Sequence, residues 1–443
     1  MCIKLYAILR LLGFGEGESF LNFSFIHAAD IHLDSPLKGL SRYEGAPVER
    51  LRSATREAFK NLIDLAIEEK VDFIIIAGDL YDGDWKDYNT GLFFANEMAR
   101  LKKHNIPVYM IKGNHDAASI ITKEIKLPDN VYVFDEKKCN SIFIEELGVA
   151  LHGQGFSSRA VTDNLAKNYP PKASGYFNIG ILHTSAVGRE GHENYAPCSI
   201  EDMKGKGYDY WALGHIHKRE HLCEKNPVIL FPGNIQSRHS KETGAKGCTL
   251  IKVTDGQIEN LNHIPLDVLR WEIVDIDASL HSEYDQLLLA IEERLEKSLD
   301  ESEGRMLAVR IIVTGNTVLY EDLLKNKEGF LNDIRAAAFT VGHGQVWIEK
   351  LKIKTTAPLA ESNQLSDENN PLTAIFNWLE TCEMDELVSD VKKELSAIIN
   401  ALPTELKKGD NHVIPDNVSM LEEKLQEVEQ LVKLELKMER GNK

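Results

Sequence analysis

Six short apolar runs in the first 265 residues constrain the fold of this chain more than any other feature. They are rich in β-branched residues and most end in Asp, Asn or His: FSFIHAAD, VDFIIIAGD, IPVYMIKGN, FNIGILH, YDYWALGH and VILFPGN. Apolar runs of this length, bounded by turn residues, are typical of buried strands. A helical pattern separates the first two runs, with apolar residues three or four apart from Leu51 to Leu65. Strands separated by helices predict a layered α/β fold whose polar residues gather at strand carboxyl ends.

Length and composition exclude several classes of protein. The chain has 443 residues, of which 43% are hydrophobic and 27% charged, so it is neither disordered nor collagen-like, and its length predicts two or three domains. No run approaches the ~18 consecutive apolar residues of a membrane span. Arg10 interrupts the short apolar stretch at the N-terminus, and the six cysteines contain no CxxC pair. We therefore expect a cytoplasmic protein with reduced thiols and no membrane association.

The order of the patterns divides the chain into five regions. Residues 1–21 form an N-terminal extension, and residues 22–268 a first α/β domain. Residues 269–358 predict a small α/β domain with strands at Trp271–Ile276, Met306–Val313 and Val346–Ile353. The polar stretch 359–370 predicts a linker. Residues 371–443 predict helices, because their apolar positions recur every three or four residues.

The net charge of −18 is concentrated in the last three regions. Residues 266–443 carry 20 basic and 35 acidic side chains, and such a surface repels phosphate polyanions. We therefore do not expect it to grip nucleic acid. The C-terminal helices either form a self-contained bundle or dock an apolar stripe onto a partner, and periodicity leaves both interpretations open.

Five short motifs follow the predicted strands, and together they predict a metal site. They are Asp-Ile-His, Gly-Asp, Gly-Asn-His-Asp, the His of ILHTS, and Gly-His-Ile-His. Each is common by chance, but five in order at strand ends are not. They supply seven candidate ligands: Asp30, His32, Asp79, Asn114, His183, His215 and His217. Oxygen and imidazole ligands without cysteine favour Mn²⁺ or Fe²⁺. Two such ions about 3.5–4 Å apart can promote in-line displacement at phosphorus.

This motif set resembles that of the calcineurin-like metallophosphoesterase superfamily. The longer stretches HAADIHLDSP, GDLYDGDW, LHTSAVGREGHENYAPCS and FPGNIQSRHSKETGAKGC resemble, within it, SbcD-type nucleases of DNA double-strand-break repair, especially their YhaO-like bacterial branch. The similarity extends from about Phe23 to Val253. It implies an α/β fold: a four-layer αββα metallophosphoesterase sandwich, followed by a small α/β capping module and a C-terminal helical region that binds a partner.

The resemblance also implies a role for each motif residue. Asp30, His32 and His217 would hold one metal, Asn114, His183 and His215 the other, and Asp79 would bridge them. His115 resembles the family histidine that contacts the scissile phosphate and protonates the leaving oxygen, with Asp116 as its orienting partner. An imidazole of ordinary pKa ~6.5 suits that task near neutral pH. Asp82 stands where some branches carry a histidine, and its role is left open.

The function that the resemblance implies is a metal-dependent DNA nuclease or phosphodiesterase. Metal-bound hydroxide would attack a backbone phosphate, with Mn²⁺ as the expected metal, 3′-to-5′ exonuclease activity, and an SbcC-like, SMC-like coiled-coil ATPase as partner; a homodimer is a further possibility. Lys218, Arg219 and Arg238 adjoin the motifs and are candidate DNA phosphate contacts.

Two alternatives remain open. The motifs encode phosphoester hydrolysis and not a substrate, so a small-molecule phosphodiesterase or phosphatase, for example one acting on cyclic nucleotides, is the first. His183-Thr184, where cyclic-nucleotide enzymes commonly have tandem histidines, argues against it. The second is a catalytically idle scaffold for an ATPase, against which the complete ligand set argues.

Overall fold

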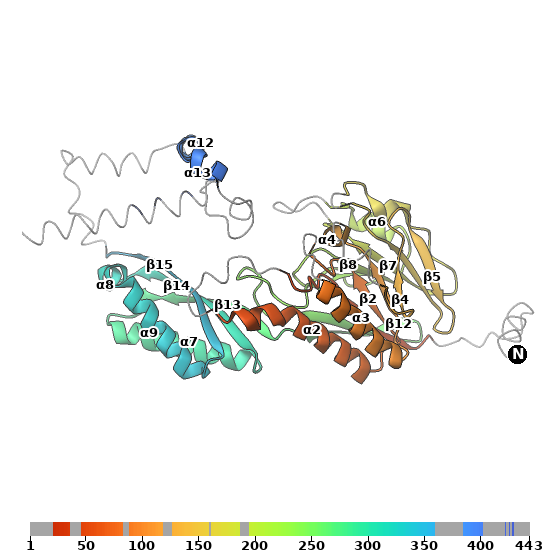
Figure 1. Ribbon diagram of the computed structural model, residues 1–443, viewed down its shortest axis with the longest axis horizontal. Coiled ribbons are helices and arrows are strands. Elements are labelled where there is room, and N and C mark those ends of the chain that lie inside the picture. Colours follow the sequence, from red (N-terminus) through yellow and green to blue (C-terminus); the bar gives the residue numbers. More distant parts are fainter. Residues whose placement is uncertain are drawn as a thin grey trace, which may run out of the picture. The chain divides into compact units, whose positions relative to one another are not determined.

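The computed structural model describes residues 21–35, 46–82, 88–117, 126–158, 161–186, 195–358 and 384–401, together with Leu421, Leu425 and Val428. The described residues form two compact units: residues 21–35 and 49–271 make up the first, and residues 46–48 and those from Glu272 onward make up the second (Figure 1). No helix among the described residues is both long and apolar enough to cross a membrane.

The first unit contains a six-stranded sheet in the order β12-β11-β1-β2-β3-β4. Its strands are β1 (Phe23–Ala28), β2 (Phe73–Ala77), β3 (Val108–Ile111), β4 (Val131–Val133), β11 (Gly247–Thr254) and β12 (Gln257–Pro265). Strands β1 to β4 are parallel, β11 pairs with β1 in antiparallel orientation, and β12 pairs with β11 in antiparallel orientation. All five residues of β2 are buried, because a central parallel strand is covered on both faces.

A second six-stranded sheet has the order β5-β6-β7-β8-β10-β9. Its strands are β5 (Asn140–Ile144), β6 (Val149–Gln154), β7 (Phe177–His183), β8 (Tyr210–Gly214), β9 (Glu220–Cys223) and β10 (Val228–Phe231). The four central strands are parallel, and β5 and β9 close the edges in antiparallel orientation. Both sheets therefore have several strands whose carboxyl ends point the same way.

Alternate residues of the two sheets form one shared core. Phe25 and Ile75 of the first sheet belong to the same buried cluster as Ile179 and Tyr210 of the second. Because successive side chains of a strand point to opposite faces, the neighbours of these residues pack outward against helices.

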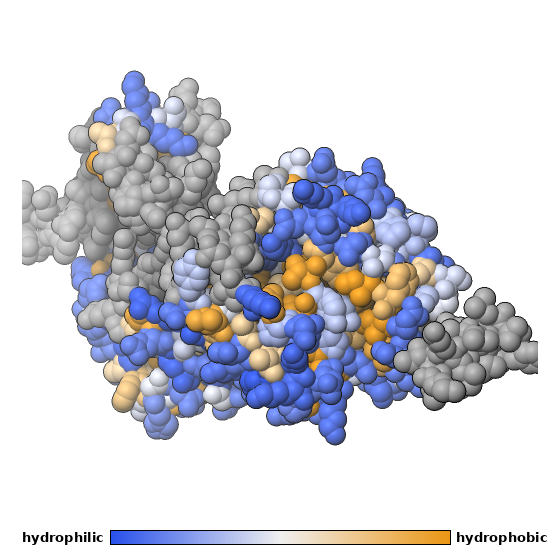
Figure 2. All heavy atoms as spheres, turned by 45° about the vertical axis from the view of Figure 1, so that its right-hand side comes forward, coloured by the Kyte–Doolittle hydropathy of each residue, from blue (hydrophilic) through white to orange (hydrophobic). Residues whose placement is uncertain are grey.

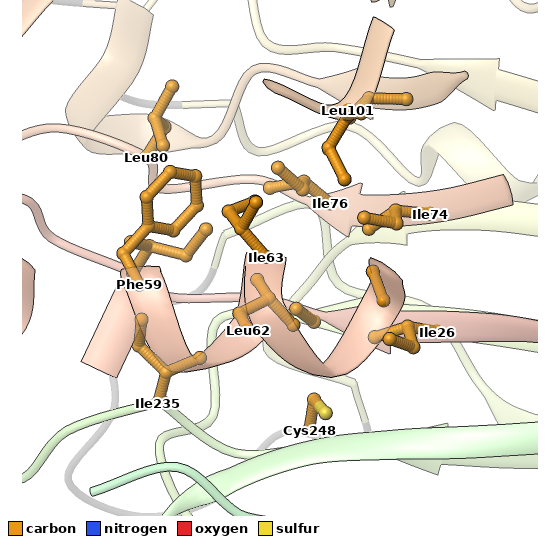
Figure 3. Close-up of a cluster of buried hydrophobic side chains, with 14 of the residues drawn as sticks. Ile26, Phe59, Leu62, Ile63, Ile74, Ile76, Leu80, Leu101, Ile235 and Cys248 are labelled. Carbon is orange, nitrogen blue, oxygen red and sulfur yellow. The ribbon is translucent and has the colours of Figure 1, made fainter. Parts of the chain in front are cut away.

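Helices cover the outer face of each sheet. On the first, α2 (Val48–Glu68) and α3 (Tyr88–Lys103) pack on Ile74 and Ile76 through Leu62 and other apolar residues (Figure 3). On the second, the short helices η2 (Leu165–Asn168) and α6 (Ile200–Lys204) pack around Trp211. The predicted four-layer αββα fold is confirmed.

The second unit is the small α/β module that the sequence predicts. Its sheet has the order β13-β14-β15, and its remaining elements surround one core. The elements are β13 (Leu269–Asp277), η3 (Ala278–Leu280), α7 (Tyr284–Glu301), β14 (Met306–Asn316), α8 (Tyr320–Lys325), α9 (Lys327–Gly342) and β15 (Val346–Thr356). Two helices follow, α12 (Met384–Glu394) and α13 (Ser396–Ala401). The predicted linker at 359–370 and most of the N-terminal extension lie outside the described residues.

The face drawn in Figure 2 is largely hydrophilic, with apolar residues exposed between the charged ones. Large apolar side chains that are more than half exposed include Leu92, Leu280, Val318 and Phe339. Exposed apolar residues are normal for a folded chain, and we assign no function to them.

Candidate metal centre

The predicted ligands lie at the carboxyl ends of five strands. Asp30 follows β1 and Asp79 follows β2, while Asn114 begins α4 (Asn114–Ala117) after β3. His183 is the last residue of β7, and His215 and His217 follow β8. Since these are parallel strands of two stacked sheets, their polar ends meet at one edge of the sandwich.

Asp79 lies in the middle of the cluster. Its Oδ2 atom is 3.4 Å from His183 Nε2 and 3.9 Å from His32 Nε2. A carboxylate between two imidazoles is the position that a bridging ligand requires.

The remaining ligands lie on either side of Asp79. On one side, the Nε2 atoms of His32 and His217 are 3.2 Å apart, and donor atoms of these two residues and Asp30 all lie within 4.8 Å of one another. On the other side, His183 Nε2 is 3.0 Å from Asn114 Oδ1.

Asp30 and His215 do not fit a simple division of the candidate ligands between two metals. Asp30 also groups with Asp79 and His183, so it adjoins both sides. The ring centroid of His215 lies 5.2 Å from that of His183, while its backbone N–H donates to both carboxylate oxygens of Asp30, at 3.0 and 2.9 Å. His215 therefore orients Asp30 in addition to presenting its ring.

The backbone at the ligands is strained. Asp30, His32, Asp79 and His215 have φ angles of 51°, 47°, 53° and 106°, a region that costs a non-glycine residue about 1–3 kcal/mol. Nearby, Gly113 permits a close approach, because a Cβ there would lie 2.2 Å from Asp79 Oδ1. The strained backbone and the close approach at Gly113 bring the candidate ligands close together, as expected where local strain occurs at a functional site.

Burial and mutual charge shift the pKa values of the cluster. Burial raises the pKa of Asp30 to about 6 and lowers that of His32 to about 4. Burial alone would raise the pKa of Asp79 and lower that of His183, but their mutual attraction reverses both, leaving Asp79 below its usual range and His183 at about 9. A cation that binds these groups must therefore displace the His183 proton.

Each of three candidate ligand imidazoles has a hydrogen-bond acceptor beside its other nitrogen. His32 Nδ1 lies 2.8 Å from Asp82 Oδ1, and His217 Nδ1 lies 2.5 Å from Glu242 Oε1. His183 Nδ1 lies 2.9 Å from the Ala77 carbonyl oxygen. Such contacts fix the tautomer and turn Nε2 towards the metal position. Sequence reasoning missed Glu242, which lies in a quoted stretch but in none of the five motifs.

The structure corrects the role predicted for Asp116. Its buried carboxylate accepts backbone N–H bonds from Leu80, Tyr81 and Gly113 at 2.9–3.1 Å, so it braces the loops and does not orient His115. The carboxylate beside the His115 ring is that of Asp82, whose Oδ1 is 3.2 Å from His115 Nδ1. This contact supplies the role that the sequence left open for Asp82.

The three candidate DNA contacts lie in different surroundings. Arg238 is at the site, with Nη2 3.5 Å from Asp82 Oδ2 and a side chain 24% exposed. Lys218 is exposed beside His217. Arg219 lies near His221 and His263, whose pKa values are lowered by burial and then by the Arg219 charge. The structure thus places Arg238 against the site and turns Arg219 towards other residues.

The donor set fits a pair of divalent cations. The groups of described residues that could hold a metal contain carboxylates and imidazoles without cysteine. The carboxylate oxygens, the Asn114 amide oxygen and the imidazoles are the ligands preferred by Mn²⁺ and Fe²⁺.

Comparison with known proteins agrees with this geometry. Residues 23–219 match the calcineurin-like phosphoesterase family, and residues 271–356 match the middle domain of metallophosphoesterase YhaO. The chain is 37% identical over 319 residues to an uncharacterized metallophosphoesterase YhaO of Bacillus subtilis, covering 71% of this chain and 76% of that protein. It belongs to the calcineurin-like metallophosphoesterases. Members of this family depend on two metal ions and hydrolyse phosphoesters.

More distant relatives of this metallophosphoesterase are named as DNA repair proteins. The Mre11 double-strand break repair protein of Sulfolobus acidocaldarius is 25% identical over 326 residues, which cover 70% of this chain and 79% of that protein. A dimetal phosphatase structure from Danio rerio aligns with 55% of this chain and 97% of its own, at 11% identity and a TM-score of 0.33.

Proposed function

We propose that this metallophosphoesterase is a Mn²⁺-dependent DNA nuclease that cleaves backbone phosphodiesters from 3′ ends. The main observation in favour of hydrolytic activity is the position of His115. Its side chain is 30% exposed, whereas those of Asp79 and His183 are at most 2% exposed. A substrate phosphate reaching the buried cluster thus meets His115 at the solvent side. The relatives named for DNA repair and the partly exposed Arg238 side chain at the site support DNA as the substrate.

The residues of the site divide the chemical work. A bound cation pair supplies activation of water and neutralises charge on the phosphoryl oxygens. The seven ligands hold the cations, and Asp82 holds His115 by Nδ1. Nε2 of His115 is then the atom that gives its proton to the departing 3′-oxygen. Arg238 attracts the phosphate backbone without reading base sequence.

We also propose an SMC-like coiled-coil ATPase as partner. The apolar positions of α12 and α13 support it, since Ile398 on α13 is 60% exposed and anchors of this kind suit docking on a helix. Ile398→Glu should abolish co-purification with the ATPase while the nuclease domain keeps its cations. Unchanged co-purification would remove α13 from the interface.

One experiment separates DNA from other substrates. The full chain is incubated with Mn²⁺ and linear duplex DNA labelled at either end, or with cyclic mononucleotides, and His115→Ala is the inactive control. Loss of the 3′ label first supports the proposal. Hydrolysis confined to the mononucleotides identifies a small-molecule phosphodiesterase, and bound metal without any hydrolysis identifies an idle scaffold.

A matched variant tests the DNA contacts apart from the chemistry. Lys218→Ala removes an exposed charge beside the site without touching a ligand. If the DNA backbone passes there, its affinity for DNA should fall and the salt dependence of binding should weaken by about one unit of slope. Turnover of bis(p-nitrophenyl) phosphate, which has no polymer backbone, should not change.

A further inference from the structure

The loop between β10 and β11, residues 232–246, contacts one half of the metal centre. Its Asn234 N–H and its Lys246 ammonium donate to the His217 carbonyl oxygen at 3.3 and 3.2 Å. Its Glu242 holds the ring of the same residue at 2.5 Å. His217 is thus fixed at both backbone and side chain by a single segment.

Glu242 is itself rigidly held. It is 8% exposed, and its Oε2 atom accepts from Asn234 Nδ2 at 3.0 Å and from the Arg238 N–H at 2.6 Å. Ser237 Oγ donates to the Glu242 carbonyl oxygen at 2.7 Å. A buried carboxylate with this many donors keeps one orientation, so the His217 ring that it binds is also kept in place.

The same loop reaches the second imidazole of that half. Arg238 Nη2 lies 3.5 Å from Asp82 Oδ2, and Asp82 Oδ1 holds His32 Nδ1. Both imidazoles in the group of Asp30, His32 and His217 are therefore backed by carboxylates that the loop contacts.

The other half of the centre is braced by different elements. His183 is the last residue of β7, and its Nδ1 atom bonds to the carbonyl oxygen of Ala77 on β2. Asp79 Oδ1 accepts from the His115 N–H at 2.9 Å. These contacts come from strand ends and from α4, not from the β10–β11 loop.

We propose that Glu242 is a positioning residue that makes one of the two cation sites, that of Asp30, His32 and His217, dependent on the β10–β11 loop. This inference rests on the two-cation site of the proposed function. A carboxylate on the remote nitrogen raises the basicity of a ligand imidazole, and losing such a partner costs about 10–100-fold in metal affinity. The expected loss falls on one cation and spares the other.

Mn²⁺ binding to the full chain tests the proposal without any assay of activity. Calorimetry should show two Mn²⁺ in the unsubstituted protein, and Glu242→Gln should weaken one of them about tenfold or more. The electron paramagnetic resonance spectrum recorded with two equivalents of Mn²⁺ should change, in Glu242→Gln, from that of a coupled pair towards that of isolated ions. Glu259→Gln on β12, which removes an exposed partner of Lys252, is the matched control and should leave both sites unchanged.

Two further variants keep the test decisive. Ser237→Ala loosens the loop without altering the Glu242 carboxylate, so it should weaken binding of the same cation by less than Glu242→Gln does. It also provides a test if the Glu242→Gln protein does not fold. Asn114→Ala should weaken the opposite cation. If the Glu242 and Ser237 variants lose Mn²⁺ affinity equally at both sites, or lose none, the inference is overturned. If the unsubstituted protein still binds two cations in that case, the two-cation centre itself stands. If the unsubstituted protein binds no Mn²⁺, both this inference and the proposed function are overturned.

Discussion

Asp82 Oδ1 lies 3.2 Å from His115 Nδ1. The same oxygen is 2.8 Å from His32 Nδ1, so one carboxylate touches both a candidate metal ligand and the partly exposed ring of His115. Asp82 is buried yet keeps its charge. Burial alone would raise its pKa, but His32, Arg238 and Ser35 bring it below its usual range. A carboxylate beside Nδ1 of His115 directs Nε2 of that ring outward.

The first prediction concerns His115 as a proton donor. His115→Ala should reduce kcat on DNA by roughly 10²–10⁴, the usual contribution of a general acid, while both cations stay bound. The loss should be much smaller with bis(p-nitrophenyl) phosphate, whose leaving group departs without a proton. Steady-state kinetics on both substrates, with metal content measured alongside, check this. Equal losses on the two substrates would remove His115 from the acid role.

The second prediction separates Asp82 from His115. Asp82→Asn keeps the shape of the side chain but removes its charge, so kcat on DNA at saturating Mn²⁺ should fall, by less than in His115→Ala. Because Asp82 acts through His115, the double variant should be no slower than His115→Ala alone. Additive losses would show that Asp82 contributes mainly through His32 and the cation there.

The layered fold and the clustering of the seven candidate ligands could be predicted because both depend on local patterns. Each buried strand is a short apolar run, and the carboxyl ends of parallel strands meet at one edge. The contacts behind the ligands could not be predicted in this way. Asp116 is next to His115 in sequence, but the short helix α4 turns its carboxylate towards the backbone of Leu80 and Tyr81. Glu242 reaches His217 only through the path of the β10–β11 loop.

Two other structural features could not be read from the sequence pattern, for a similar reason. The predicted strands of the small module end at Val313 and Ile353, whereas β14 and β15 continue in parallel pairing to Asn316 and Thr356. Backbone pairing extends these strands through polar residues that an apolar pattern does not reveal. Likewise Arg56, one of several basic residues on α2, forms a bidentate pair with Asp34. Periodicity places it on a helix face but does not identify its partner.

The third prediction concerns the close approach at Gly113. Gly113→Ala should displace Asp79, because the added Cβ would lie 2.2 Å from its Oδ1, and the protein should lose Mn²⁺ affinity while remaining folded. Gly205→Ala is the control, since Gly205 is the C-cap of α6 and its Cβ would meet the carbonyl oxygens of Glu201 at 3.2 Å and Asp202 at 3.8 Å, neither of them a candidate ligand. Metal content after dialysis, with circular dichroism, checks both variants. Full occupancy in Gly113→Ala would show that Asp79 is not held where the structure places it.

The last prediction concerns acid stability and His27, a buried residue of β1. Its Nδ1 lies 2.9 Å from the Tyr210 hydroxyl and its Nε2 3.1 Å from the Leu213 carbonyl oxygen, which links the two sheets. Burial lowers its pKa to about 3 despite the bond to Leu213, so the unfolded chain, with a pKa near 6.5, binds this proton more readily. The stability that neutral His27 contributes is therefore complete above pH 6.5 and is lost as the pH falls from 6.5 towards 3.

At pH 5 the loss should amount to about 2 kcal/mol. His27→Gln cannot take up a proton in this range, so its free energy of unfolding should fall less between pH 7.5 and pH 5.0. Urea unfolding of both proteins, with cations removed by chelator, gives the two differences. The other titrating groups contribute equally to both proteins and cancel in the comparison. An identical fall in the two would mean that His27 is protonated in the folded chain, and that the bonds between β1 and β8 do not depend on its neutral form.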